Sequence, residues 1–415
     1  MACPRHRHSC HKCAPDGRTG SKDFLSDAMR KTVLNVAILG STGSIGKSAL
    51  EVIAASEGKL RVAALTAHGQ LDLAIDQART HQARWLVATD TVAAESQDWS
   101  ALPADTELLL GEDGLRRVAM ADEVDKVVAA IVGSAGLVGT WAALEAGKTV
   151  ALANKETLVV AGSLAMSLAD QTGATILPVD SEHSAVFQAL AAGQRDELQR
   201  VILTASGGPF RDYTSEQLSE VTVQQALSHP NWSMGPKITI DSATMMNKAL
   251  EIVEARWLFD LAPEQIDVVL HRQSIVHSLV EFIDGSIIAQ LSPPDMKLPI
   301  QYALTYPERR RGPAPRLDLT QYQHLEFQPP DPERFPALDL GLRVARDGGS
   351  AGAVLNGANE AAVAGFLNGE MRFHEIVPIC KSVLDHHQYD SQPSLEQLLE
   401  YDAWAREEVS RWVCA

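Results

Sequence analysis

Two clusters of carboxylate, amide and ammonium side chains are the residues of this sequence best suited to chemistry. Asp180 and Glu182 follow an apolar run two positions apart, and in an extended backbone their side chains would point to one side. Asn247, Lys248 and Glu251 would share one face of a helix. The three carboxylates would suit a hard divalent cation such as Mg²⁺, Mn²⁺ or Co²⁺. Each cluster also has an explanation that involves no binding site. Asp180 and Glu182 could be a solvated strand end, and the helical cluster could be an i,i+3 ion pair.

A glycine-rich turn, Gly40-Ser41-Thr42-Gly43-Ser44-Ile45-Gly46, lies between an apolar strand-like run and a helical pattern. Glycines let a backbone approach a pyrophosphate, and the N-terminus of the next helix supplies N–H groups and the positive end of its dipole. The first gap between glycines is one residue longer than in the usual dinucleotide fingerprint. The strand–turn–helix setting nevertheless predicts a nucleotide-binding loop.

The run His68-Gly69-Gln70, after the second predicted strand, bears on which dinucleotide is bound. An NAD enzyme usually carries Asp or Glu at this place for the ribose hydroxyls. No acid stands here, and Asp72 lies inside the next predicted helix. The sequence therefore favours NADPH, with His68 as the one basic side chain of this run.

A lid is predicted between the two carboxylate clusters, over residues 206–235. Ser206-Gly207-Gly208-Pro209-Phe210 opens it, and His229-Pro230-Asn231-Trp232-Ser233-Met234-Gly235 closes it. Gly and Pro at both ends could act as hinges, and Trp232 could cover an apolar face of a ligand. A surface loop with Trp232 packed down fits the composition equally well.

The run Asn154-Lys155-Glu156 follows a predicted strand that ends near Leu152. Ligands bind beyond the carboxyl ends of strands in open α/β sheets, so this run is a candidate for the same site. Asn154 can also cap the next helix, a structural role that holds whether or not its neighbours face a ligand.

Apolar runs alternate with helical patterns in the first part of the chain. Helices are expected at residues 45–55, from 71 and from 137. Such alternation predicts an α/β fold with a Rossmann-like parallel sheet and helices on both faces. The expected strands are 34–39, 61–66, 85–88, 107–110, 126–132, 149–152 and 174–179.

The rest of the chain reads as a mixed region, a linker and a run of helices. The mixed region has expected strands at 201–204, 268–271, 278–282 and 286–291, and a helix from about residue 244. Residues 306–336 are rich in Pro and Arg and resemble a linker. We therefore expect an NADPH-binding domain at 33–180, a central α+β catalytic domain at 181–305, and a C-terminal helical domain at 337–415.

Composition excludes several classes of protein. The 415 residues carry a net charge of −17, which argues against broad nucleic-acid binding. No apolar run reaches the roughly 18 residues that span a bilayer. No cysteine occurs between residues 14 and 379, which excludes a disulfide framework and a cysteine nucleophile there. The same usage fits a reducing compartment, so we expect a cytoplasmic protein.

Residues 1–30 differ in composition from the remainder. They are rich in His, Cys and Arg and contain no hydrophobic segment, so they are not a secretory signal. Cys3, Cys10 and Cys13, with neighbouring histidines, could bind zinc. We instead expect residues 1–32 to be a disordered tail, with a true start at Met29 as one explanation.

Together these segments resemble the 1-deoxy-D-xylulose 5-phosphate reductoisomerase family, and they occur in that family's order over about residues 33–410. The matching runs are 40–46, 153–156, 178–183, 206–210, 229–235, 237–251, 271–278 and Leu355-Asn356-Gly357-Ala358-Asn359-Glu360. The resemblance implies an NADPH- and metal-dependent enzyme that makes 2-C-methyl-D-erythritol 4-phosphate for non-mevalonate isoprenoid synthesis. It also implies a homodimer with dimer contacts in the central domain.

The resemblance assigns roles to individual residues. The metal would be held by Asp180, Glu182 and Glu251. The substrate backbone would be contacted by Lys155, Ser181, Asn247 and Lys248. Its phosphate would be held by Ser206, Ser242, Asn247, Lys248 and His229. NADPH would be contacted by Thr42, Gly43, Ser44, Ile45, Gly69, Gln70, Asn154, Glu156 and Gly235. The run His68-Gly69-Gln70 stands where the family usually has Gly-Lys-Asn.

The implied reaction accounts for these residue types. Rearrangement by retro-aldol and aldol steps builds enolate charge that a Lewis-acid metal stabilises, and NADPH then reduces an aldehyde. Lys155 could stabilise developing negative charge, and a closed lid would exclude water. One alternative, a semialdehyde-type dehydrogenase, needs a cysteine nucleophile. Another, a non-catalytic nucleotide sensor, need not keep a set of metal ligands.

Overall fold

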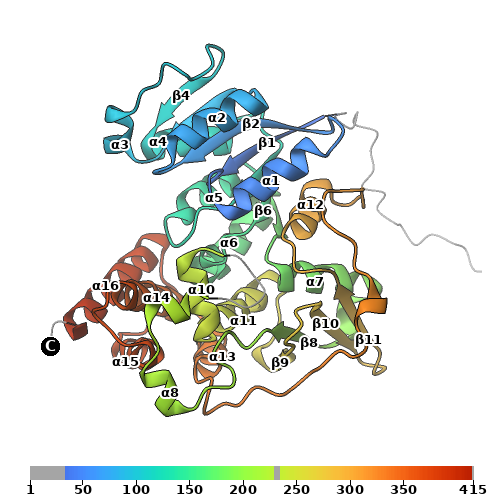
Figure 1. Cartoon of the computed structure of the whole chain (residues 1–415), viewed down its shortest axis with the longest axis vertical. Helices are drawn as coiled ribbons and strands as arrows, with labels where there is room; N and C mark the ends of the chain where they lie inside the picture. The colour runs from blue at the N-terminus through green and yellow to red at the C-terminus, as the bar shows by residue number, and fades with distance from the viewer. Residues whose placement is uncertain (1–32, 229–233, 414–415) are drawn as a thin grey trace, which may run out of the picture. The chain divides into compact units, whose positions relative to one another are not determined.

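The computed structural model describes residues 33–228 and 234–413 (Figure 1). His229 and Trp232 of the predicted lid, and the tail predicted at 1–32, lie outside the described residues. Within the described ranges, no helix combines the length and the apolar character needed to cross a membrane.

The first part of the chain forms a seven-stranded sheet with the strand order β4-β3-β2-β1-β5-β6-β7. All neighbouring strands are parallel, which confirms the predicted Rossmann-like sheet. The strand order changes direction between β1 and β5. The strands are β1 Leu34–Leu39, β2 Leu60–Ala67, β3 Trp85–Ala88, β4 Glu107–Leu110, β5 Lys126–Ala129, β6 Thr149–Leu152 and β7 Thr175–Pro178.

Strand β5 is shorter than predicted. The expected end at residue 132 is wrong, because the chain leaves the sheet after Ala129 and turns at Gly133, whose φ is 76°. Ile131 and Val132 extend the apolar run but line a cavity instead of pairing with a neighbouring strand. Hydrophobicity alone could not separate these two uses of an apolar side chain.

Side chains alternate across the first sheet and pack helices on both faces. Val36 and Ile38 of β1 enter one core, and Ala37 and Leu39 enter the other. Burying a side chain of the size of Val36, Ile38 or Leu39 contributes about 1.5–3 kcal/mol. The first core is covered by α1 Ser44–Ala54, α2 Leu71–His81 and α12 Lys297–Thr305. The second is covered by α4 Gly111–Met120, α5 Gly136–Glu145 and α6 Glu156–Thr172, and α3 Thr91–Ser96 lies between β3 and β4 in the chain.

Helix α12 returns to the first sheet from the middle of the chain. Ile300, Ala303 and Leu304 are buried in the core beside α1. Lys126 of β5 donates through Nζ to the carbonyl oxygens of Ala303 at 3.2 Å and Leu304 at 2.9 Å, at the carboxyl end of α12, where a cation is favourable. Burial lowers the pKa of Lys126 to about 8. The domain bounds stay a prediction. Helix α12 belongs by sequence to the predicted central domain, but its side chains are buried in the core of the first sheet.

A second, four-stranded sheet has the order β11-β10-β8-β9. Only β8 and β9 are parallel; the other pairs are antiparallel. It shares one core with helices that precede it, interrupt it and follow it in the chain, and those after residue 336 confirm the helical C-terminal region. The strands are β8 Leu198–Ala205, β9 Ile266–Leu270, β10 Val276–Phe282 and β11 Ile287–Leu291. The helices are α7 Ser181–Ala189, α8 Ser215–Ser219, α9 Val223–Ala226, α10 Pro236–Ala243, α11 Met246–Leu258, α13 Ala337–Asp347, α14 Ala351–Leu367, α15 Ile376–His386 and α16 Leu395–Val413.

The Pro- and Arg-rich segment 306–336 contains one short 3₁₀ turn, Leu319–Gln321, and otherwise irregular backbone. It is nevertheless fixed to the second sheet. Gln328 exchanges backbone hydrogen bonds with Leu270 at 2.8 and 3.0 Å, and the ring of Phe327 stacks on His271 with centroids 4.7 Å apart. The predicted linker is thus bound to the end of β9 through Phe327 and Gln328.

Helices α6 and α14 approach each other closely. A Cβ added to Gly352 of α14 would lie 2.0 Å from the carbonyl oxygen of Val159 in α6, so only glycine fits there. This contact fixes the helix at whose start Lys155 and Glu156 lie.

Candidate active site

The predicted site residues gather at the carboxyl edge of the first sheet. The segments that follow β1, β5, β6 and β7 line a cavity of about 680 Å³, and α10, α11 and the ends of β8 and β10 supply its other walls. This volume suits a small-molecule ligand. The change of strand direction between β1 and β5 is where open α/β sheets bind ligands.

The glycine turn is built for close backbone approach. Gly40 has a φ of 88°, and a Cβ there would lie 2.8 Å from the carbonyl oxygen of Ala130. A Cβ on Gly46 would lie 2.4 Å from the carbonyl oxygen of Gly40, so helix and turn can meet only without side chains. Helix α1 begins at Ser44 with Gly43 as its N-cap and without a capping side chain. Gly43, Ser44 and Ile45 line the cavity, whereas Thr42 is nearly buried outside it.

The run His68-Gly69-Gln70 is exposed at the end of β2 and is not part of the cavity wall. Nδ1 of His68 lies 3.2 Å from Oγ1 of Thr89, and its Nε2 lies 3.8 Å from Oδ2 of Asp90. A 2′-phosphate at this edge would therefore meet one histidine and one carboxylate.

The backbone around Asp180 and Glu182 differs from the prediction. The expected extended conformation is wrong, because Asp180 is the N-cap of α7 and Glu182 lies in its first turn. The helix starts as the carbonyl oxygen of Asp180 accepts a hydrogen bond from the backbone N–H of Ser184 at 2.8 Å. The two carboxylates nevertheless meet Glu251. One oxygen from each of the three lies within 4.8 Å of the others.

The second cluster also has a different backbone from the one expected. The helix predicted from residue 244 is preceded by a separate helix, α10, and α11 begins at Met246. Met245 joins them at a φ of 61°, a conformation that costs a non-glycine residue on the order of 1 kcal/mol or more. As predicted, Asn247, Lys248 and Glu251 share one face of α11.

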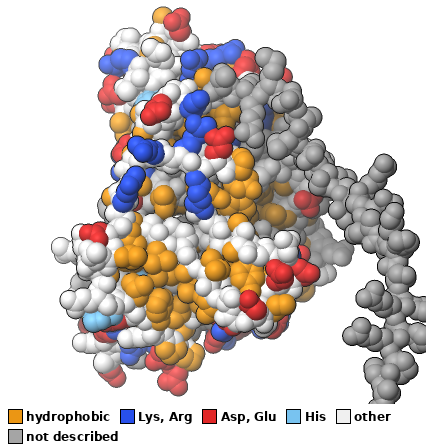
Figure 2. All heavy atoms as spheres, turned by 90° about the vertical axis from the view of Figure 1, so that its right-hand side faces the viewer, with side chains coloured by type: hydrophobic (Ala, Val, Ile, Leu, Met, Phe, Trp, Pro, Cys, Tyr) orange, Lys and Arg blue, Asp and Glu red, His pale blue; other side chains and the backbone are white. Residues whose placement is uncertain are grey.

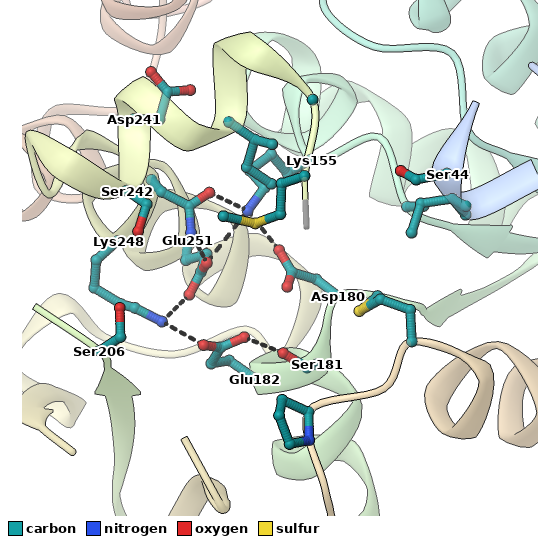
Figure 3. A pocket seen from close by; sticks show the side chains of 18 of the residues that line it. Ser44, Lys155, Asp180, Ser181, Glu182, Ser206, Asp241, Ser242, Lys248 and Glu251 are labelled. Carbon is teal, nitrogen blue, oxygen red and sulfur yellow. Dashed lines mark hydrogen bonds and ion pairs between the residues drawn. The ribbon is translucent and has the colours of Figure 1, made fainter. Parts of the chain in front are cut away.

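Two buried lysines connect the carboxylates (Figure 3). Nζ of Lys155 lies 2.5 Å from Oδ2 of Asp180 and 3.3 Å from Oε1 of Glu251, and it donates to Oδ1 of Asn247 at 2.7 Å. Nζ of Lys248 lies 3.1 Å from Oε1 of Glu182 and also contacts Oε2 of Glu251. Oγ of Ser181 donates to Glu182 at 2.5 Å.

Burial and charge act in opposite directions on these groups. Burial would raise the pKa of Asp180, but Lys155 and then His183 hold it well below its usual value. Burial and the charge of Glu182 raise the pKa of Glu251, and the two lysines offset this only in part. Burial would lower the pKa of Lys155, yet the surrounding carboxylates raise it well above its ordinary value. Both charge types are therefore concentrated in one buried place.

Ser206, Ser242 and Lys248 lie on the same side of the cavity (Figure 3). Gly208, at the start of the predicted lid, packs so closely that a Cβ on it would lie 2.7 Å from the carbonyl oxygen of Ser242. Phe210 is buried against Phe373 with ring centroids 5.1 Å apart. The first residues of the predicted lid are therefore packed in the core. The middle of the lid segment contains α8 and α9.

Three ion pairs beside the site were not predicted from the sequence. Nζ of Lys237 lies 2.8 Å from Oε1 of Glu156 and 2.8 Å from Oδ2 of Asp241. Nδ1 of His183 lies 2.9 Å from Oε2 of Glu254, and its Nε2 lies 3.0 Å from the Glu251 carbonyl oxygen. Burial would lower the pKa of His183, but Glu254 raises it to about 9. The i,i+4 spacing of Lys237 and Asp241 was the one available signal.

The N-cap of α6 is Lys155, one residue after the expected Asn154, but the Asn154 side chain still bonds to the first turn of the helix. Its Oδ1 accepts from the backbone N–H of Thr157 at 3.2 Å, in the first turn of α6. Its Nδ2 donates to Oε2 of Glu156 and to the carbonyl oxygen of Gly133, both at 2.9 Å. The side chain therefore also connects two walls of the cavity.

The cysteine-dependent alternative finds no support in the described ranges. Cys380, their one cysteine, lies on α15 inside the hydrophobic core. Burial raises the pKa of its thiol, which disfavours the thiolate that a nucleophile requires.

Three matches to protein families cover most of the chain. Residues 36–162 match 1-deoxy-D-xylulose 5-phosphate reductoisomerase, residues 176–259 match the C-terminal domain of that enzyme, and residues 291–408 match the DXP reductoisomerase C-terminal domain. A 1-deoxy-D-xylulose 5-phosphate reductoisomerase from Heliobacterium modesticaldum is 52% identical over 378 residues, which are 90% of this chain and 96% of the relative. The chain belongs to this reductoisomerase family. A family member from Thermomicrobium roseum is also 52% identical, over 90% of this chain and 96% of its own.

Solved structures of reductoisomerases agree in fold over the same span. One, described as a complex with NADPH, fosmidomycin and magnesium, is 44% identical with a TM-score of 0.87, and the alignment covers 92% of this chain and 98% of that one. Another, from Zymomonas mobilis in complex with NADPH, is 42% identical with a TM-score of 0.84, covering 92% and 99%. The resemblance drawn from the sequence motifs is confirmed.

Proposed function

We propose that this chain catalyses the NADPH-dependent rearrangement and reduction of 1-deoxy-D-xylulose 5-phosphate to 2-C-methyl-D-erythritol 4-phosphate. The observation that carries the proposal is one cavity in which a nucleotide loop at one wall faces three carboxylates and two lysines at another. The reductoisomerase family of the chain supports the same reaction. It belongs to the non-mevalonate route to isoprenoid precursors.

The three carboxylates fit a divalent cation. Asp180, Glu182 and Glu251 converge with oxygen donors only, the set that Mg²⁺, Mn²⁺ or Co²⁺ prefers. A cation would also relieve the repulsion that raises the pKa of Glu251. When bound, the metal would supply Lewis-acid stabilisation of enolate charge, and NADPH would supply the hydride.

The side chains around the carboxylates would bind and orient the substrate. Lys155 keeps its proton at neutral pH because its pKa is raised, so its Nζ can donate to an oxygen that gains negative charge. Ser181 and Asn247 would contact the substrate backbone beside it. Lys248, Ser206 and Ser242 would hold the phosphate together with His229, and the lid at 206–235 would exclude water.

The cofactor would occupy the wall nearest the first sheet. The predicted cofactor residues that line the cavity are Gly43, Ser44, Ile45, Asn154, Glu156 and Gly235. The roles of Thr42, Gly69 and Gln70 stay predictions, because these residues lie outside the cavity lining. His68 is our candidate for the 2′-phosphate.

We further propose a homodimer in the cytoplasm. Strand β11 is an edge of the second sheet, and it exposes Ile287 and Ile288, with Ile283 exposed in the preceding turn. An open strand edge with exposed hydrophobic residues favours pairing with another chain. Figure 2 faces the side on which β11 lies and shows hydrophobic side chains gathered across its lower half. The absence of cysteine from 14 to 379 supports a reducing compartment.

The reaction is tested by following NADPH absorbance with the phosphosugar and Mn²⁺. We expect oxidation that requires both the sugar and the metal, and a product identified by mass spectrometry as the methylerythritol phosphate. A folded sample that binds NADPH but shows no metal-dependent oxidation would overturn the assignment. Sedimentation of the same sample tests the dimer, and a monomer at all concentrations would contradict it.

A further inference from the structure

The run Leu355–Glu360 matches the family but has no place in the reaction proposed above. It lies on α14, and its polar members Asn356 and Asn359 are fully buried. Buried polar groups on a helix are costly unless partners satisfy them. Their partners show what the run does.

Glu360 holds the loop that follows β5, residues 130–135. Its Oε1 accepts a hydrogen bond from the backbone N–H of Ser134 at 3.2 Å. A Cβ on Gly133 would lie 3.0 Å from Oε2 of Glu360, so the carboxylate lies directly against this turn. Ala130, Ile131 and Val132 of the same loop line the cavity. Glu360 thereby sets the position of a cavity wall that it does not itself form.

Two further groups bind the carboxylate of Glu360, and a third side chain, Asp402, binds both of them. Arg406 of α16 lies 2.8 Å from its Oε2, and Nδ2 of Asn356 donates to its Oε1 at 3.1 Å. Asp402 in turn accepts from Nδ2 of Asn356 at 2.8 Å and pairs with Nε of Arg406 at 2.7 Å. The last helix of the chain therefore holds the side chain that holds the loop.

Asn359, the neighbour of Glu360, reaches a second wall. Its Nδ2 donates to Oδ1 of buried Asp241 on α10 at 2.8 Å. Asp241 pairs through its other oxygen with Lys237, which pairs with Glu156 at the start of α6. Helix α10 begins directly after Gly235, the last residue of the predicted lid.

These contacts close on themselves. Glu156 accepts from Nδ2 of Asn154, and the same amide donates to the carbonyl oxygen of Gly133, next to the Ser134 N–H that Glu360 holds. We call this closed path the polar ring. It runs through the loop after β5, the start of α6, the start of α10, and α14.

We propose that Asn359 and Glu360 are positioning residues for the dinucleotide, because α14 closes the polar ring that fixes the cofactor walls relative to each other. This inference rests on the proposed function. Four members of the ring line the cavity, namely Asn154, Glu156, Lys237 and Asp241, whereas Asn359 and Glu360 do not. Removing one contact of the ring leaves buried polar or charged groups unpaired. The loop after β5 and the starts of α6 and α10 are then no longer held in fixed positions relative to one another. The C-terminal helices thus act on cofactor binding without touching the cofactor.

The test uses Asn359→Ala and Glu360→Gln in the full chain, with Asn368→Ala and Glu370→Gln as matched controls. The two control residues are exposed just beyond the end of α14. We expect each ring variant to raise the Kd and KM for NADPH by about five- to tenfold. The kcat and the Mn²⁺ requirement should change by less than about twofold, because the metal-site carboxylates Asp180, Glu182 and Glu251 lie outside the ring. The controls should match the wild type.

The double variant distinguishes a ring from two independent contacts. If α14 closes one ring, the second cut adds less than about twofold to the Kd of the worse single variant, because the ring is already open. If the double variant instead raised the Kd by the product of the two single-variant factors, the two contacts would be independent and the ring would be refuted. Arg406→Gln, at a position about one-third exposed, provides a milder variant with the same expected direction should a buried substitution fail to fold.

A purely structural role would lower Tm and leave the NADPH Kd unchanged in folded protein, and that result would overturn the proposal. Hydrogen exchange adds a local readout: amides of residues 130–136 should exchange faster in Glu360→Gln than in its control. Unchanged exchange there would also contradict it. If the wild type itself bound no NADPH, the proposed function would fail, and this inference with it.

Discussion

Replacing Glu251 by Gln removes one charge from the centre of the carboxylate cluster while keeping the shape of the side chain. Glu251 is fully buried, with Oε1 3.3 Å from Nζ of Lys155 and Oε2 in contact with Lys248. Weakening the hold on a Lewis-acid cation that stabilises developing enolate charge is expected to cost about 4 kcal/mol, or roughly a thousandfold in kcat. We expect that loss of kcat.

The NADPH Kd of the same variant should change by less than about twofold, because the nucleotide loop and the polar ring do not include Glu251. Steady-state NADPH oxidation measures kcat, titration measures the Kd, and a Mn²⁺ series measures the metal requirement. Glu264→Gln is the matched control, since Glu264 is 70% exposed. If Glu251→Gln instead weakened NADPH binding as much as turnover, with an unchanged Mn²⁺ requirement, the carboxylates would not be the metal site.

Three further substitutions test the packing around the site. Lys237→Met leaves two buried carboxylates without their shared cation and should cost about 3–5 kcal/mol in chemical denaturation; a loss near zero would contradict the ring. Lys126 has a folded pKa of about 8 against an ordinary 10.5, so the unfolded chain binds more protons between these values. Stability relative to Lys126→Met should therefore rise by about 2 kcal/mol from pH 7 to pH 10, and a flat difference would refute the burial argument. Gly352→Ala places a Cβ 2.0 Å from the Val159 carbonyl oxygen and should cost about 1–3 kcal/mol, so an unchanged Tm would show that α6 and α14 can separate freely.

The periodicity of the sequence predicted the strands of the first sheet and three of the helices around it, α1, α2 and α5, because local patterns carry that information. It failed where a local pattern serves another purpose. Ile131 and Val132 continue an apolar run yet line the cavity. Asp180 follows a strand but caps a helix, and Met245 breaks a helical pattern with a φ of 61°. These three departures all lie at the site, where ligand geometry outweighs local preference.

The candidate site was predictable through its motifs, but its connections were not. Asn359 and Asp241 are 118 positions apart, and Ser134 and Glu360 are 226 apart. No spacing rule links residues so distant, because only the tertiary fold brings them together. Lys237 with Asp241 was the exception, since an i,i+4 pair can be read from sequence.

Helix α12 has a consequence for how the protein can be made. It covers the face of the first sheet near β6 and β7, but its residues follow the whole of the central region in the chain. During synthesis, the strands up to residue 178 are complete well before their cover at 297–305 exists. The first sheet therefore cannot complete its packing before the central region has been synthesised, unlike a typical N-terminal domain, which folds first. We expect a fragment ending near residue 180 to be aggregation-prone, and genes for such chains to tolerate neither a split nor a fusion at that apparent boundary.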